Sequence, residues 1–131
     1  MASPRDRSMS FAHLTLPTLD VEGTARFLEQ TLGFTRDPVP ANSPVETVWL
    51  AIGGGQQIHI IQIENFAVSP FEGEFGRHIA IFRHAEEIAV LKERLLGAGA
   101  HVMQPLRPSA NERIFFREPV NGYVFEVIAL A

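Results

Sequence analysis

Four side chains that can bind a metal ion lie at matching positions in the two halves of this sequence. His13 and His78 each lie in what reads as the first strand of a half. His59 and Glu126 lie in the last strands, and each follows its histidine by almost the same number of positions. Two similar halves packed about an approximate twofold axis would bring all four together. Imidazole and carboxylate groups together suit a divalent iron, manganese, cobalt, nickel or zinc ion.

The residues next to Glu126 strengthen this hypothesis. Side chains two positions apart share one face of a strand, so Glu126 lies on the same face as Val124 and Ile128. A carboxylate on such an apolar face is buried or lies in a cleft, where an unpaired charge is costly. His59 shares its face with Ile61 and faces the same problem. Both residues therefore need a partner, and one metal ion would serve both.

Each candidate taken singly also has a simpler explanation. A lone histidine in a strand is most often a hydrogen-bonded core or surface residue. Glu126 could pair with Arg113 or Arg117 on a neighbouring strand. The coincidence of four candidates at matching positions is what favours a metal site. His84 and His101 flank the second helix instead of lying in strands, and we expect both on the surface.

The order of secondary-structure elements is the same in each half. Hydrophobic periodicity predicts a strand, a helix and then two or three strands. In the first half these cover residues 11–16, 21–32, a short strand near 35–39, 46–52 and 57–63. In the second half they cover residues 77–82, a helix from 88 to 97 or 99, a short strand near 101–104, 113–116 and 123–130. Residues 64–76 lack periodicity and read as a linker.

Turn and cap residues mark the ends of these elements. We expect Pro17 to end the first strand, Asp20 to cap the first helix and Gly33 to stop it. Three consecutive glycines, 53–55, predict a turn and no phosphate-binding loop, because no helix follows them. Asn121 and Gly122 predict a hairpin-type turn before the last strand.

Composition limits the classes of partner. The chain has 131 residues, 46% of them hydrophobic, which is enough for the core of one domain. A net charge of -4 without a basic patch argues against nucleic acid and anionic membranes. The absence of cysteine excludes disulfides, thiolate ligands and a cysteine nucleophile. Without an apolar run long enough to span a membrane, or a signal-peptide core, we expect a cytoplasmic protein with a flexible tail over residues 1–10.

These motifs resemble those of the vicinal oxygen chelate superfamily, which includes glyoxalase I, fosfomycin-resistance proteins, methylmalonyl-CoA epimerase, bleomycin-resistance proteins and extradiol dioxygenases. The resemblance runs from Phe11 to Ala131 and is carried by residues 11–16, 31–34, 57–60, 76–81 and 116–127. It implies an α+β fold, in which two βαβββ modules (11–64 and 76–131) form a cupped mixed sheet around a metal site. The ligand positions of the family fall on His13, His59, His78 and Glu126. A homodimer is also implied.

The sequence departs from several branches of this superfamily. Where glyoxalase I usually has a carboxylate or glutamine as second ligand, this chain has His59, and Pro17 replaces the arginine that binds glutathione. Fosfomycin-resistance proteins have a serine-rich cation-binding loop, for which only Ser109 remains. Extradiol dioxygenases use two histidines and a glutamate, but their usual acid–base residue has no assured counterpart here. Bleomycin-resistance proteins lose the metal ligands, which are intact here.

The resemblance implies a metal-dependent enzyme of the dioxygenase or the lyase/isomerase type. Its small oxygenated substrate would chelate the metal. Glu126 would be the catalytic carboxylate, and Arg77 and Arg113 would anchor an anionic substrate. The alternative is a protein of the same fold that sequesters a small molecule without turnover. Three phenylalanines in the linker either form a dimer contact or pack under their own loop: Phe66, Phe71 and Phe75.

The matching positions predict that the histidines differ in their effect on metal binding. His78→Ala should lower metal affinity by orders of magnitude, whereas His101→Ala should leave it nearly unchanged. Isothermal titration of each variant with a divalent metal measures the difference. Equal affinities would remove the basis for choosing ligands by their place in the repeat.

Overall fold

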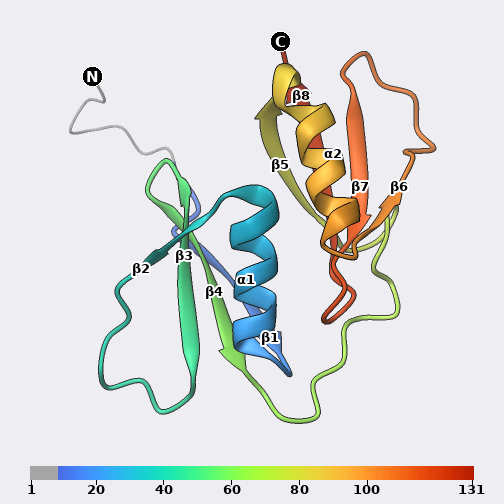
Figure 1. The fold of residues 1–131 in the computed structure, drawn as a ribbon. Helices are drawn as coiled ribbons and strands as arrows, with labels where there is room; N and C mark the ends of the chain where they lie inside the picture. The colour runs from blue at the N-terminus through green and yellow to red at the C-terminus, as the bar shows by residue number, and fades with distance from the viewer. Residues whose placement is uncertain (1–8) are drawn as a thin grey trace.

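A computed structural model describes residues 9–131, which form an α+β protein with two βαβββ modules (Figure 1). The first module contains β1 (His13–Thr18), α1 (Val21–Leu32), β2 (Thr35–Asp37), β3 (Thr47–Gly53) and β4 (Gln56–Gln62). The second contains β5 (Ile79–His84), a 3-10 turn (Ala85–Glu87), α2 (Ile88–Gly97), β6 (His101–Met103), β7 (Arg113–Arg117) and β8 (Val124–Leu130). Most of the tail predicted over residues 1–10 lies outside the described residues. Within residues 9–131 no helix has the length and apolar composition to cross a bilayer.

The two modules repeat one sheet topology, which confirms the fold predicted from the half-repeat. The strand order is β1-β4-β3-β2 in the first sheet and β5-β8-β7-β6 in the second. In each sheet the first strand runs parallel to the last, and the remaining pairs are antiparallel. As a result, β1 and β5 are edge strands within the described part of the chain. These edges matter because His13 begins β1 and His78 immediately precedes β5.

Two strand boundaries differ from the prediction. Pro17 does not end the first strand, since β1 continues to Thr18. The strand pairs on one side only, so a residue without a backbone N–H is tolerated at this edge. The fifth strand begins at Ile79 instead of Arg77, because Arg77 and His78 bond to the preceding loop: Arg77 N donates to the Phe71 carbonyl. His84 and His101 are exposed, as expected, although they lie at the ends of β5 and β6.

The first helix follows directly from its sequence. The Asp20 carboxylate accepts a hydrogen bond from Gly23 N at 2.9 Å, and Gly33 ends the helix in a left-handed conformation with φ of 74°. Between these caps the apolar residues at helical spacing are buried, Leu28 among them. The helix also contacts the second module, where the Phe27 ring lies 6.0 Å from that of Phe116 in β7.

A partly buried polar network joins the modules beside this apolar contact. Thr18 donates to Asn121 Oδ1 at 2.7 Å, and the Asn121 amide donates to Thr24 Oγ1 at 3.0 Å. The Tyr123 hydroxyl donates to the Pro17 carbonyl at 2.7 Å. These bonds connect the end of β1 to the loop that begins β8. They therefore fix the strand that carries His13 relative to the strand that carries Glu126.

Candidate metal site

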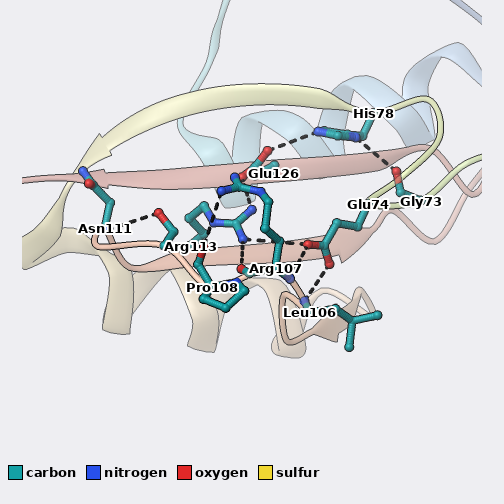
Figure 2. A network of polar contacts seen from close by, with 10 residues as sticks. Gly73, Glu74, His78, Leu106, Arg107, Pro108, Asn111, Arg113 and Glu126 are labelled. Atoms are coloured by element: carbon teal, nitrogen blue, oxygen red, sulfur yellow. Dashed lines mark hydrogen bonds and ion pairs between the residues drawn. The ribbon is translucent and has the colours of Figure 1, made fainter.

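The second module holds Glu126 between a histidine and an arginine (Figure 2). Glu126 Oε1 lies 3.1 Å from His78 Nε2, and Oε2 accepts a hydrogen bond from Arg113 Nη1 at 2.7 Å. The Glu126 side chain is 7% exposed and that of Arg113 is 3% exposed. Phe125 and Val127 point into the core, so Glu126 lies on the opposite face of β8. The buried carboxylate thus has a cationic partner, which is Arg113 and not Arg117.

The tautomer of His78 is set by the loop before β5. Nδ1 lies 3.0 Å from the Gly73 carbonyl oxygen, which can only accept, so Nδ1 carries a proton and donates it. In the neutral ring Nε2 then presents a lone pair toward Glu126 Oε1. Two lone pairs at 3.1 Å attract each other only through a cation, either a proton or a metal ion. With a proton on Nε2 the two residues form an ion pair, and without it they present two ligand atoms that a divalent metal could bridge.

Arg113 is held in place by the loops on either side of it. Its Nη2 donates to the Arg107 carbonyl and lies 3.8 Å from Glu74 Oε2, while Nε is buried without a hydrogen-bond partner among the described residues. The Glu74 carboxylate accepts from Leu106 N at 2.7 Å and from Arg107 N at 3.0 Å. The Leu106 N–H lowers the pKa of Glu74, and Arg107 and Arg113 add to this effect. Glu74 therefore stays ionised and keeps both loops beside Arg113.

The first module contributes a stack of three rings from adjacent strands. His13 in β1 stacks on His59 in β4 with ring centroids 3.8 Å apart and planes at 8°. The other face of His59 stacks on Trp49 in β3 at 4.0 Å and 2°. Burial lowers the pKa of His59, and the neighbouring His13 lowers it further. His59 Nε2 lies 2.8 Å from Gln57 Oε1, so the ring is held by its edge as well as by both faces.

The four predicted ligands fall into two pairs, one in each module. Within residues 9–131 no group of three or more histidine, aspartate or glutamate side chains is arranged to hold a metal ion. His13 and His78 line one open cavity of about 860 Å³ between the modules, while His59 and Glu126 are not in its lining. A single site made by all four residues stays a prediction.

The two predicted substrate anchors differ in their surroundings. Arg113 is engaged by Glu126. Arg77 pairs with the buried carboxylate of Glu72, and its guanidinium lies 4.9 Å above the Tyr123 ring. Arg77 also lines the cavity, with 38% of its side chain exposed. It is therefore the better placed of the two to meet a ligand, and anchoring by either residue stays a prediction.

The linker phenylalanines differ in their surroundings. Phe66 packs on Tyr123 with ring centroids 5.8 Å apart, under its own loop. Phe71 and Phe75 are each 74% exposed on the loop that carries Gly73 and Glu74. A dimer contact through these two residues stays a prediction.

Sequence reasoning missed Trp49, Gln57 and Glu74. The sequence did hold a signal for Trp49, because pairing β3 and β4 outward from the turn at 53–55 places Trp49 opposite His59. Gln57 lies two positions before His59 in β4, so the two side chains share one face of the strand. Glu74 lies in a segment without periodicity, so its contacts with residues 106 and 107 could not be found in this way.

Comparison with known proteins assigns the family. The sequence model of the Glyoxalase/Bleomycin resistance protein/Dioxygenase superfamily matches residues 10–127, and the chain belongs to this superfamily. No protein of curated function matches it in sequence.

Solved structures of similar fold include fosfomycin resistance proteins. FosX from Listeria monocytogenes has a TM-score of 0.74 at 23% identity, over 96% of this chain and 93% of that one. FosX from Mesorhizobium loti has a TM-score of 0.69 at 22% identity, over 96% of this chain and 94% of that one. A third structure is a mutant of the Listeria protein in complex with Mn(II) and 1S,2S-dihydroxypropylphosphonic acid. Its TM-score is 0.71 at 24% identity, over 93% of this chain and 90% of that one.

The contact between Arg113 and Glu126 predicts that a single variant loses more stability than a double variant. Arg113→Met should destabilise the fold by roughly 3–5 kcal/mol, because it leaves a buried carboxylate without its cation. The double variant Arg113→Met with Glu126→Gln should recover part of this loss, since no buried charge is then unpaired. Urea denaturation of both variants measures the difference. A single variant as stable as the wild type would contradict the role given to Arg113.

Proposed function

We propose that this protein is a metal-dependent enzyme that acts on a small oxygenated substrate. One divalent ion would be held by His13, His78 and Glu126. The observation that carries the proposal is the contact between His78 Nε2 and Glu126 Oε1, aimed by the bond between His78 and Gly73. When bound, the ion supplies a Lewis acid or a centre for oxygen chemistry. Activity assays distinguish dioxygenase from lyase/isomerase chemistry.

We further propose that two copies of the chain share each site. One chain offers its donors in pairs, and the described residues hold no group of three. The exposed His13 lies on β1 and the half-buried His78 directly precedes β5, and both strands lie at sheet edges, where a second copy can approach. In a homodimer, His13 of one copy would meet His78 and Glu126 of the other. The exposed Phe71 and Phe75 provide apolar surface for such a contact.

Arg113 determines what Glu126 can contribute. Its guanidinium occupies Oε2 at 2.7 Å, so one oxygen is left to bind a metal. A carboxylate held from both sides is a good ligand and a poor carrier of substrate protons. Enolate chemistry would then need another base, so the geometry favours reactions in which Glu126 is a ligand alone.

The charges near the site favour an anionic substrate. Arg113 is positive at all relevant pH values and offsets the single negative charge of Glu126. A divalent ion added to this pair, two neutral histidines and the ionised Glu74, 3.8 Å from Arg113, still leaves net positive charge. That charge attracts a chelating anion such as a phosphonate, enolate or catecholate. The FosX structure with Mn(II) and a phosphonic acid makes phosphonates reasonable first probes.

The cavity keeps sequestration open as a second function. It is open to solvent and has apolar lining such as Phe11, Ile79 and Phe82, which could hold a ligand without chemistry. Removing the metal by chelation distinguishes the two functions: an enzyme loses activity, whereas a sequestering protein keeps its ligand.

Metal loading followed by a substrate panel tests the proposal. Reconstituted protein should bind about one divalent ion per chain. Three assays should follow: fosfomycin with the Mn(II) form, catechols with the Fe(II) form, and methylglyoxal plus glutathione with the Ni(II) and Zn(II) forms. We expect little glutathione-dependent turnover, because His59 and Pro17 replace the family residues for that reaction. Well under half an ion per chain would contradict the metal site, and robust lyase turnover would restore glyoxalase chemistry.

A further inference from the structure

The ring of His13 has support that an exposed residue does not ordinarily have. His13 begins an edge strand and is exposed to solvent, yet one face of its ring is covered by His59 at 3.8 Å. His59 is in turn backed by Trp49 at 4.0 Å, with the three planes nearly parallel. Trp49 and His59 are direct neighbours across β3 and β4, and His13 is diagonal to His59 across β4 and β1. The stack therefore crosses three strands and ends at His13.

Hydrogen bonds fix the orientation of His59 within the stack. Gln57 Nε2 donates to Asp37 Oδ2 at 2.7 Å, and a carboxylate oxygen can only accept. The amide of Gln57 is therefore oriented with Oε1 toward His59 Nε2, at 2.8 Å. Because Oε1 also only accepts, Nε2 of His59 carries the proton and donates it. The lone pair of the neutral ring then lies on Nδ1, so any ligation by His59 would use that nitrogen, while Trp49 and His13 cover the two ring faces.

We infer that His59 and Trp49 are positioning residues, which hold the His13 ring in the orientation that binds the metal. This inference rests on the proposed function and replaces the expected role of His59 as a fourth ligand. A histidine at an exposed strand end samples several rotamers, and fixing one of them before the metal arrives lowers the entropy lost on binding. The line from Asp37 through Gln57 to His59 gives the stack a rigid base in β2 and β4.

Two substitutions at one position separate positioning from ligation. His59→Phe keeps a flat ring between Trp49 and His13 but has no ring nitrogen, whereas His59→Ala removes the ring. We expect His59→Phe to bind Zn(II) with close to wild-type affinity and His59→Ala to bind it about 10- to 100-fold more weakly. His101→Ala is the control and should match the wild type. Isothermal titration measures each affinity, after circular dichroism has verified folding.

The outcomes are distinguishable. Equal losses in His59→Phe and His59→Ala would make His59 a ligand and overturn the inference. Wild-type affinity in both would make it a bystander and also overturn it. Wild-type protein that binds no metal would overturn the proposed function and the inference with it. If His59→Ala does not fold, Trp49→Leu takes its place: weaker binding supports the inference, and unchanged binding contradicts it.

The tryptophan supplies a second readout, which tests whether the metal binds at the His13 end of the stack. Trp49 is the one tryptophan of the sequence, so the emission of the protein reports the stack directly. Co(II) bound at His13 would lie two rings away and should quench this emission as the site fills. Quenching should follow metal occupancy in the wild type and in His59→Phe, and should be lost in His13→Ala. If the Trp49 emission of the wild type stays unchanged while titration shows that Co(II) binds, the placement of His13 at the metal is contradicted.

Discussion

The arrangement around Glu126 depends on one electrostatic constraint. A carboxylate with 7% of its side chain exposed needs a partner for its charge, and Arg113 supplies it. Arg113 occupies one oxygen, and the other lies 3.1 Å from His78 Nε2. The Gly73 carbonyl orients His78, and Glu74 keeps the loops beside Arg113 in place. Two loops without secondary structure thereby acquire fixed positions. The carboxylate is left with a single oxygen facing a histidine nitrogen.

The duplicated module explains why the donors come in pairs. Each βαβββ unit places one histidine where its first strand begins and one polar side chain on its last strand. In one chain the modules are joined through the Phe27–Phe116 contact and the bonds from Thr18 and Tyr123. These contacts bury apolar surface of α1, and among the described residues they bring no three of the four side chains into one group. A second copy, related by twofold symmetry, is the simplest way to combine them.

The sequence predicted the regular parts of this structure well. Period-2 alternation and helical spacing depend on local chemistry, so the strands, the α1 caps and the half-repeat could be identified directly. Boundaries that depend on tertiary contacts could not: Pro17 is tolerated because β1 is an edge, and β5 starts late because Arg77 and His78 bond to a loop.

The candidate site shows the same division. The positions of His13, His59, His78 and Glu126 followed from the repeat, but their partners required the side-chain contacts. The pairing of β7 with β8 leaves Arg113 and Arg117 as equal choices for Glu126, because Phe115 lies opposite Glu126 and each arginine is two positions from Phe115; the side-chain contact to Arg113 decides between them. Arg117 instead donates to the Gly122 carbonyl at 2.9 Å, within its own hairpin. Ring stacking and loop anchoring by Glu74 depend on contacts between segments distant in sequence, which periodicity does not encode.

Mixing two inactive variants tests most directly whether two copies share one metal site. His13→Ala and Glu126→Gln each destroy every site in their own homodimers. If His13 of one copy meets Glu126 of the other, a mixed dimer regains one intact site of its two. Statistical exchange then restores about a quarter of the wild-type metal capacity. Equilibrium dialysis of the mixed sample against Zn(II), with each variant alone as the control, should show this recovery. Metal binding that stays at the level of the separate variants, in samples shown to contain mixed dimers, would contradict the shared site.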